Sequence, residues 1–211
     1  MARDPFSVFI NAPFDEQYRP IFEAMVFTIS ACGYRPRCAL EEDNSDIRMD
    51  KLHRLIKDSG HSLHDLSRTD VKLGELPRFN MPFELGMVIG LKRFGAKSLR
   101  GHGVKIMVAE PYKLPAYLSD LGGNDPVAHH NEPEKVIGIV CTYLQKSPDG
   151  VILAGPKRYA TAYNDFGRKL PLIAEGIGFE PEEVNAFANY PTFCHCVAEY
   201  LENPTATEAA R

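Results

Sequence analysis

A chain of 211 residues with 44% hydrophobic and 25% charged residues has the composition of a globular protein with a sizeable core, which excludes a disordered chain. Its formal net charge is −4, and no run of Lys or Arg is long enough to follow a phosphate backbone, so nucleic acid is not an expected partner. No apolar run approaches the roughly 20 residues of a membrane span, and the N-terminus lacks the pattern of a signal peptide. We therefore expect a cytoplasmic protein that does not bind a membrane.

Short apolar strands alternate with amphipathic helices along the first 147 residues. The expected elements, in chain order, are strand Phe6–Ile10, helix Gln17–Cys32, strand Tyr34–Leu40, a helix over residues 46–57, strand His61–Leu66, helix Pro82–Phe94, strand Val104–Ala109, a short helix Pro115–Leu121, a turn at Gly122–Asp125, strand Val127–His129, and a helix through Leu144 with a capping box formed by Asn131 and Glu134. Pro36 places the second strand at an edge of the sheet, because proline has no N–H to give to a neighbouring strand.

Strands that alternate with helices need crossover connections, which produce a parallel sheet covered on both faces. Residues 1–147 are therefore predicted to form a flavodoxin-like or Rossmann-like α/β domain with a five-stranded parallel sheet. Residues 148–203 change to aromatic-rich helical stretches broken by Pro171, Pro181 and Pro191, which predicts a helical appendage packed on that domain. Residues 204–211 are expected to be a disordered tail.

The cysteines and histidines do not predict a metal site. Five cysteines in a chain without a secretory signal indicate free thiols rather than disulfides. Cys194-His195-Cys196 has no second ligand pair at a recognisable spacing, so packed helical residues are the expected interpretation. His61 and His64 are three residues apart on a strand, which puts their rings on opposite faces. His64 could instead serve as a proton shuttle beside Asp65.

Polar residues follow the first and third strands, where an open parallel sheet binds its ligands. The loop after the first strand offers Asn11, Phe14 and Asp15, and the third strand ends at Asp65. The helix that follows it supplies two more candidates, Asn80 and Glu84. Each has a purely structural alternative: Asn11 and Asp15 can form turns, Asp65 and Asn80 can cap backbone N–H groups, and Glu84 is favoured electrostatically near a helix start.

The residue types in this group favour a substrate rich in hydroxyl groups. Neither GxGxxG nor GxxxxGK occurs in the chain, which argues against a standard dinucleotide oxidoreductase or a P-loop enzyme. A carboxylate in a partly apolar pocket can attack or stabilise an oxocarbenium-like carbon. Chemistry at a sugar ring, with Glu84 as the catalytic carboxylate and no metal or cofactor, is the leading hypothesis.

Three segments, FINAPFDEQYRPIFEAM, HSLHDLSR and LPRFNMPFELGMVIGLKRFG, resemble bacterial TIR-like proteins related in fold to the nucleoside 2-deoxyribosyltransferases. The resemblance covers about the first 145 residues and leaves the helical end outside it. It implies that Glu84, in the setting Glu84-Leu85-Gly86, is the carboxylate at the anomeric carbon of a nucleoside or of NAD. It further implies that Asp65 contacts the base or ribose and that Asn11 and Phe14 line the pocket.

The sequence departs from this family pattern in two ways. The first loop reads NAPF where the deoxyribosyltransferases have a glycine-containing element, and the chain lacks the tryptophan that TIR enzymes carry near the glutamate. Two functions therefore remain open. The first is cleavage or transfer at the N-glycosidic bond of a nucleoside, nucleotide or NAD, and the second is a non-catalytic TIR-like nucleotide sensor or adaptor in bacterial defence.

Assembly is expected for either function. The helix Pro82–Phe94 is apolar nearly all round, so it is predicted either to be buried between sheet and appendage or to form a contact between copies of the chain. The expected partners are thus a nucleotide or nucleoside ligand and a second copy of the chain.

Overall fold

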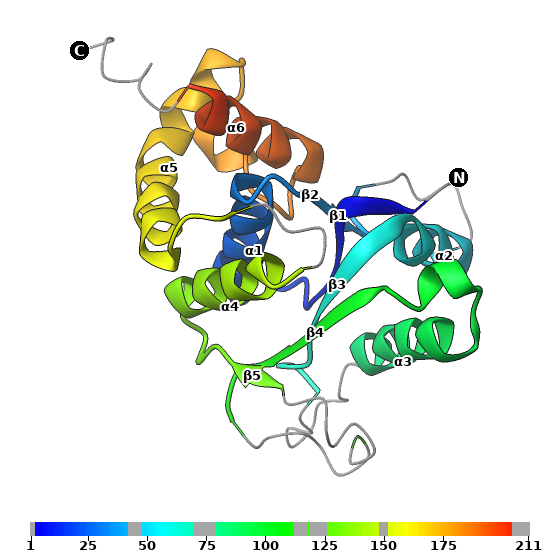
Figure 1. Ribbon diagram of the computed structural model, residues 1–211. Coiled ribbons are helices and arrows are strands. Elements are labelled where there is room, and N and C mark those ends of the chain that lie inside the picture. The colour runs from blue at the N-terminus through cyan, green and yellow to red at the C-terminus, as the bar shows by residue number, and fades with distance from the viewer. Residues whose placement is uncertain are drawn as a thin grey trace, which may run out of the picture.

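A computed structural model of the chain describes residues 3–41, 48–69, 79–111, 118, 126–147 and 152–203. Its elements, in order, are β1 (Asp4–Asn11), α1 (Arg19–Ala31), β2 (Arg35–Cys38), α2 (Arg48–Asp58), β3 (Ser59–Asp65), α3 (Asn80–Phe94), the 3-10 helix η1 (Lys97–Leu99), β4 (Gly103–Val108), β5 (Val127–Ala128), α4 (Pro133–Gln145), α5 (Pro156–Gly176), the 3-10 helix η3 (Pro181–Glu183) and α6 (Tyr190–Glu202). Figure 1 shows their arrangement around a central sheet.

The five strands form one parallel sheet in the order β2-β1-β3-β4-β5. This confirms the predicted α/β class with a five-stranded parallel sheet, and the order is the flavodoxin-like one. β2, which contains Pro36, is an edge strand as predicted. The other edge, β5, is only two residues long and pairs with β4 through Met107 and Val108.

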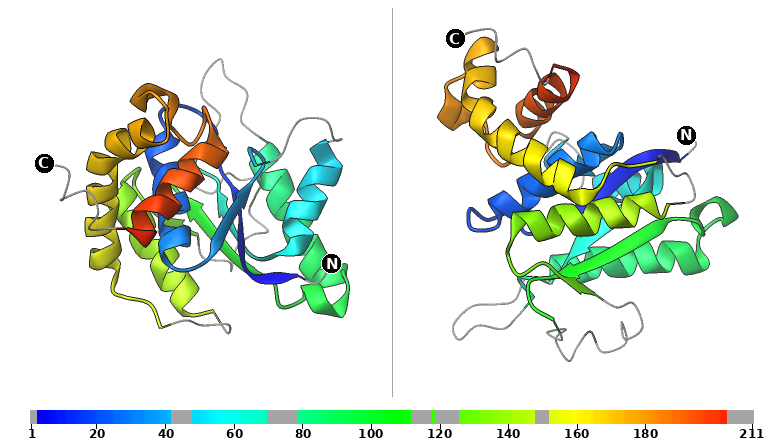
Figure 2. Two further views of the ribbon diagram at one scale, coloured as in Figure 1. Left: turned by 90° about the horizontal axis from the view of Figure 1, so that it is seen from above. Right: turned by 60° about the vertical axis from the view of Figure 1, so that its left-hand side comes forward.

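Helices cover both faces of the sheet (Figure 2). Because successive side chains of a strand point to opposite faces, each strand contributes to the packing on both sides. Val8 and Ile10 of β1 face α1 and α4 in the largest cluster of buried apolar side chains. Phe9, between them, faces the other way and packs with α2 and with Val88 of α3. The sheet is thus buried on both faces, as parallel sheets require.

The C-terminal helices pack on the outside of α1 and α4 (Figures 1 and 2). Phe166 of α5 lies with its ring centroid 5.3 Å from that of Phe27 in α1. The hydroxyl of Tyr190, at the start of α6, donates to the carbonyl oxygen of Pro36 at 3.1 Å. These side chains belong to the same core cluster as α1 and α4, so the C-terminal helices are joined to the sheet domain by a continuous apolar core.

Three local predictions differ from the structure. Pro171 lies inside α5 and does not break it; it and Gly167 are both exposed, so the Gly167 carbonyl that loses its helical partner can be hydrated. α4 has no Asn131 capping box, because Asn131 takes a left-handed conformation (φ 57°) outside the helix and Glu132 is the N-cap. α3 begins at Asn80, so Glu84 is its fifth residue and not part of its first turn.

The remaining predictions concern the segment after β4, the C-terminal tail, the cysteines and the absence of a membrane span. The helix expected at Pro115–Leu121, the turn at Gly122–Asp125 and the tail after residue 203 lie outside the described residues, apart from position 118. All five cysteines are free, and Cys196 is buried on α6. Among the described helices, none combines the length and the apolar character needed to cross a membrane.

Candidate functional site

The candidate site lies where β1 and β3 end. These strands are neighbours, and the chain leaves β1 towards α1 on one face of the sheet and β3 towards α3 on the other (Figure 1). Their carboxyl ends therefore form the switch point at which open α/β sheets bind ligands. Asn11 and Asp65 are the last residues of the two strands, and Glu84 lies one turn into α3.

Asn11 connects the end of β1 to the first turn of α3. It is buried, and its Nδ2 lies 2.9 Å from Nδ1 of His64 and 2.8 Å from the carbonyl oxygen of Met81. Because an amide nitrogen only donates, Nδ1 of His64 must accept, and the imidazole proton sits on Nε2, 2.9 Å from the Ser62 hydroxyl. Both amide protons of Asn11 are thus used inside the protein.

His64 does not face Asp65, so the shuttle suggested by their adjacency in sequence has no geometric basis. The His64 ring is bound by Asn11 and Ser62 on the face of the sheet that α2 and α3 cover. Burial, with a smaller effect of nearby His102, lowers the pKa of His64 to about 3. The ring is therefore a neutral structural acceptor at neutral pH.

Asp65 faces the opposite side, towards α1 and α4, and is fully buried. Its Oδ2 lies 2.8 Å from Nε2 of His129, and its Oδ1 accepts from the backbone N–H of Ser67 at 2.8 Å. Burial alone would raise the pKa of Asp65, but the His129 and Ser67 hydrogen bonds outweigh it and the net shift is downward. Asp65 is therefore an ionised carboxylate held by protein donors.

Ser67, His129 and Asp65 have the composition of a catalytic triad without its geometry. The hydroxyl of Ser67 lies 3.0 Å from Nε2 of His129, the same nitrogen that contacts Asp65. The other nitrogen, Nδ1, accepts from the backbone N–H of Asn131. A general base needs one nitrogen for the nucleophile and the other for its orienting carboxylate, so this group cannot activate Ser67 in that way.

Glu84 differs from these residues in having no hydrogen-bond partner among the described residues. Its exposed fraction is 5%, and burial raises its pKa to about 7, although nearby Arg48 at the start of α2 lowers it somewhat. A carboxyl group with such a pKa is divided between its acid and ionised forms near neutral pH, which is the range required of a general acid or base.

An ion pair links the two loops that leave the switch point. Asp15, after β1, pairs with Arg68, after β3, at 3.4 Å, and both side chains are about one quarter exposed. Oδ1 of Asp15 also accepts from the backbone N–H of Tyr18 at 3.0 Å and so supports the turn into α1. Asp15 therefore stabilises a turn, which is the structural role that the sequence offered as the alternative to ligand binding.

Two predicted site residues lie apart from this group. Phe14 packs edge-on against Phe22 of α1 and Phe187 of the C-terminal segment, with centroids 5.4 and 5.7 Å apart. It therefore belongs to the contact with the helical appendage. Asn80 is the exposed first residue of α3, and Phe79 precedes it as N-cap, so Asn80 is not a cap either.

Sequence reasoning missed Tyr18 and His129 as members of this site. Tyr18 is fully buried beside Asp65, and burial together with the charge of Asp65 raises its pKa well above the usual value. The ring of His129 lies edge-on to that of Tyr18, with centroids 6.2 Å apart. A signal was available for His129, because it follows β5 and so arrives at the same carboxyl edge of the sheet. Tyr18 lies within a turn and gave no such signal.

In the described ranges, His, Cys, Asp and Glu side chains form no group of three that could hold a metal ion. No family model matches the chain, and comparisons with curated proteins and with solved structures give no significant match.

Proposed function

We propose that the protein acts on the N-glycosidic bond of a nucleoside, a nucleotide or NAD, with Glu84 as the carboxylate at the anomeric carbon. The observation that carries the proposal is the state of Glu84: a carboxyl group 5% exposed, with a pKa of about 7 and no described hydrogen-bond partner, at the ligand-binding end of a parallel sheet. Burying an ionisable group without a partner is costly, so such a group is more typical of a functional site than of a structural one.

The chemistry needs one ionised carboxylate on the sugar; the nicotinamide of NAD leaves as a neutral base, whereas the base of a nucleoside must also take a proton, which water can supply. As the bond from the anomeric carbon to the base nitrogen breaks, the base leaves with the electron pair, and positive charge develops on the anomeric carbon and the ring oxygen. Ionised Glu84 would stabilise that charge or bond to the carbon, and water or a second acceptor would complete the transfer. Asn11, which binds the Met81 carbonyl three residues before Glu84, would act by positioning the carboxylate.

Turnover by wild-type protein and by Glu84→Gln tests this proposal. Purified protein is incubated with NAD, nucleoside monophosphates, nucleosides and deoxynucleosides, and release of the base is followed by chromatography. We expect release by wild type and at least a hundredfold less by Glu84→Gln, since the amide can neither attack nor carry the charge. Glu175→Gln, an exposed glutamate of α5, is the matched control. Equal rates for wild type and Glu84→Gln, or no release from any compound, would refute it.

A second candidate, a nucleotide sensor or adaptor without turnover, is favoured by a specific observation. Both amide protons of Asn11 and both oxygens of Asp65 are already bonded within the protein, which leaves few polar groups to orient a substrate. A compound that raises the melting temperature of the protein and is recovered unchanged would support this function. Consumption of the same compound would instead support the enzyme.

A further inference from the structure

One face of α4 is only partly covered by the core. Its inner residues, such as Val136, Val140 and Leu144, are buried against α1 and the sheet. A second stripe at spacings of three and four, and therefore along one side of the helix, consists of Lys135, Gly138, Ile139, Thr142, Tyr143 and Lys146. This stripe is separate from the switch point at the ends of β1 and β3.

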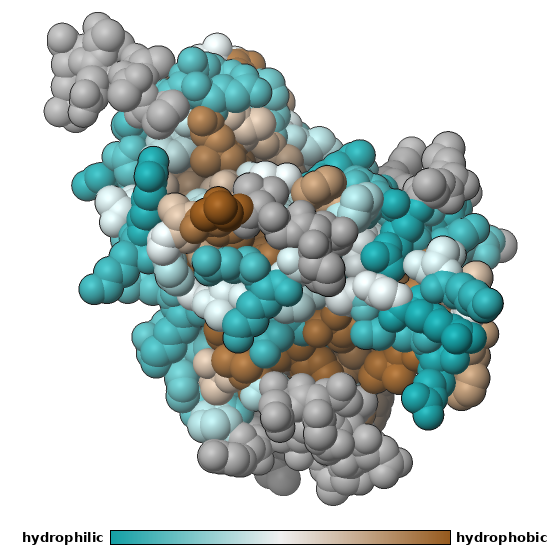
Figure 3. All heavy atoms as spheres, in the orientation of Figure 1, coloured by the Kyte–Doolittle hydropathy of each residue, from teal (hydrophilic) through white to brown (hydrophobic). Residues whose placement is uncertain are grey.

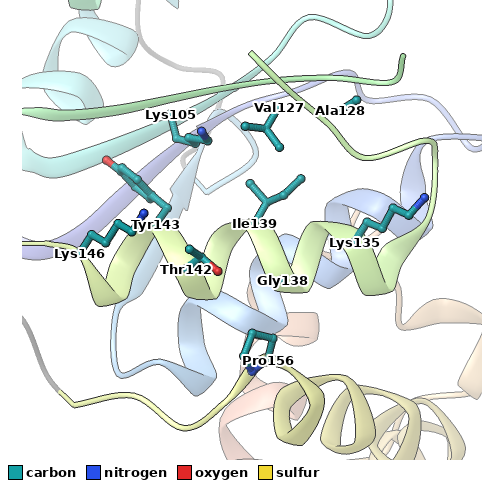
Figure 4. A pocket seen from close by; sticks show the side chains of 10 residues that line it. All are labelled: Lys105, Val127, Ala128, Lys135, Gly138, Ile139, Thr142, Tyr143, Lys146 and Pro156. Carbon is teal, nitrogen blue, oxygen red and sulfur yellow. The ribbon is translucent and has the colours of Figure 1, made fainter. Parts of the chain in front are cut away.

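The stripe lines a cavity of about 560 Å³ between α4 and the β4–β5 edge of the sheet. Figure 4 shows Val127 of β5 opposite Ile139 in the middle of the cavity. The space exists partly because β5 is only two residues long and partly because Gly138 contributes no side chain, since a Cβ built there meets nothing within 4 Å. Figure 3 shows a band of apolar side chains that runs from β5 along β4 to α3. The cavity is within the size range of small-molecule sites, about 300–1,000 Å³.

The charged side chains among the described residues that line the cavity are all lysines. Lys105 of β4 and Lys146 stand together near Tyr143 at one end, and Lys135 stands at the other (Figure 4). Lys135 is paired with Glu132 at 2.9 Å, which reduces its charge towards a ligand. The described lining residues include no carboxylate. Tyr143 directs its hydroxyl away to His61, at 3.2 Å from Nδ1, so Lys146 and Thr142 supply the polar contacts on α4.

We propose that this cavity is a binding site for a small anionic amphiphile, a carboxylate or phosphate monoester with an unbranched apolar chain. The anionic head lies at the end where Lys146 stands, and the chain lies on Val127, Ile139 and the space above Gly138. From Lys135 to Lys146 the stripe is about 16 Å long, which suits an extended chain and not a compact ring system.

Isothermal titration calorimetry of the full chain with decanoate, decyl phosphate and decanol, each below its micelle concentration, tests the proposal. We expect decanoate and decyl phosphate to bind and to raise the melting temperature, and decanol to bind at least fivefold more weakly because it lacks the charge. Lys146→Met should weaken decanoate binding about two- to fivefold, as expected for loss of one exposed ion pair, whereas Lys57→Met on α2, away from the cavity, should leave it unchanged.

Gly138→Leu places a side chain in the cavity, where the ligand chain would lie, and provides the sharpest variant. Replacing a helical glycine should stabilise the fold, so lost binding cannot be ascribed to unfolding. We expect at least tenfold weaker decanoate binding. Gly167→Leu, at an exposed and open position of α5, gains the same helix propensity and should bind as wild type does. Undiminished binding by Gly138→Leu, equal affinity for decanol, or no binding of decanoate would overturn the proposal.

Discussion

At the scale of single residues, the raised pKa of Glu84 predicts a measurable cost to the fold. Its carboxyl group binds a proton more tightly in the folded state, with a pKa of about 7, than at its ordinary value of 4.5. Stability from this group is therefore fully present below pH 4.5 and is lost as pH rises to about 7. Glu84→Gln, which keeps the shape and removes the charge, should raise the free energy of unfolding at pH 8 by up to about 3 kcal/mol.

Urea unfolding at pH 8 and at pH 4.5 checks this value, because the gain from Glu84→Gln should disappear at the lower pH. The exposed Glu175→Gln should change neither value. A Glu84→Gln variant that is less stable than wild type at pH 8 would show that the ionised carboxylate is satisfied within the protein and needs no ligand.

Two buried imidazoles predict that the fold weakens in mild acid. Burial lowers the pKa of His64 to about 3 and, with the charge of Arg3 as a smaller cause, that of His102 to about 4. Since the unfolded chain takes up these protons near pH 6.5, the stability they contribute is present above pH 6.5 and falls below it, by about 1.4 kcal/mol per pH unit for each ring.

Chemical denaturation between pH 7.5 and 5 measures this slope. His64→Asn should reduce stability at pH 7.5 and flatten the slope, because it removes one of the two rings. His53→Asn, an exposed histidine of α2, is the control and should preserve the wild-type slope. The account of His64 as a neutral acceptor fails if the slope is the same in His64→Asn as in wild type.

At the scale of elements, Asn11 joins β1 to α3. Asn11→Ala leaves the Met81 carbonyl and Nδ1 of His64 without their donor, so we expect a loss of about 1–3 kcal/mol. The first turn of α3 should also exchange its amide hydrogens faster. Asn80→Ala, on the same turn but exposed, should do neither. If hydrogen exchange in α3 is unchanged in Asn11→Ala, the side-chain amide of Asn11 does not stabilise the first turn of α3.

The sequence was informative about elements wherever local pattern decides structure. The strand at Val104–Ala109 and the edge strand with Pro36 could be predicted because apolar runs and the missing proline N–H act locally. The start of α4 could not, since Asn131 is drawn into a left-handed turn in which its N–H donates to the His129 ring. That contact depends on where β5 delivers His129, which no local pattern contains.

Site residues were predictable to a similar degree. That Asn11, Asp65 and Glu84 reach one end of the sheet follows from strand order and parallel pairing. Which face each side chain takes, and with which partners, depends on the pleat and on packing between distant segments. Phe14 illustrates this limit, because the appendage was predicted to pack on the domain but its contact between Phe187 and Phe14 was not.

At the scale of the whole molecule, the shared core predicts that the sheet and the C-terminal helices unfold together. Phe166 of α5 is buried and packs against Phe27 of α1 and Phe193 of α6. Phe166→Ala should lower the free energy of unfolding by about 3–5 kcal/mol and keep a single transition. Phe94→Ala, at an exposed position on α3, should have little effect. Two separate transitions in circular dichroism and tyrosine fluorescence would contradict a common core.

The most direct test of the central claim is the carboxyl carbon signal of Glu84 in protein labelled with ¹³C-glutamate, assigned with Glu84→Gln. This signal reports both the protonation of Glu84 and its contact with a ligand. We predict a titration midpoint near pH 7 in the free protein, and a shift of signal and midpoint on addition of a nucleoside, a nucleotide or NAD. A midpoint near 4.5, with a signal that no member of this panel moves, would contradict the claim that Glu84 lies in a nucleoside-directed site.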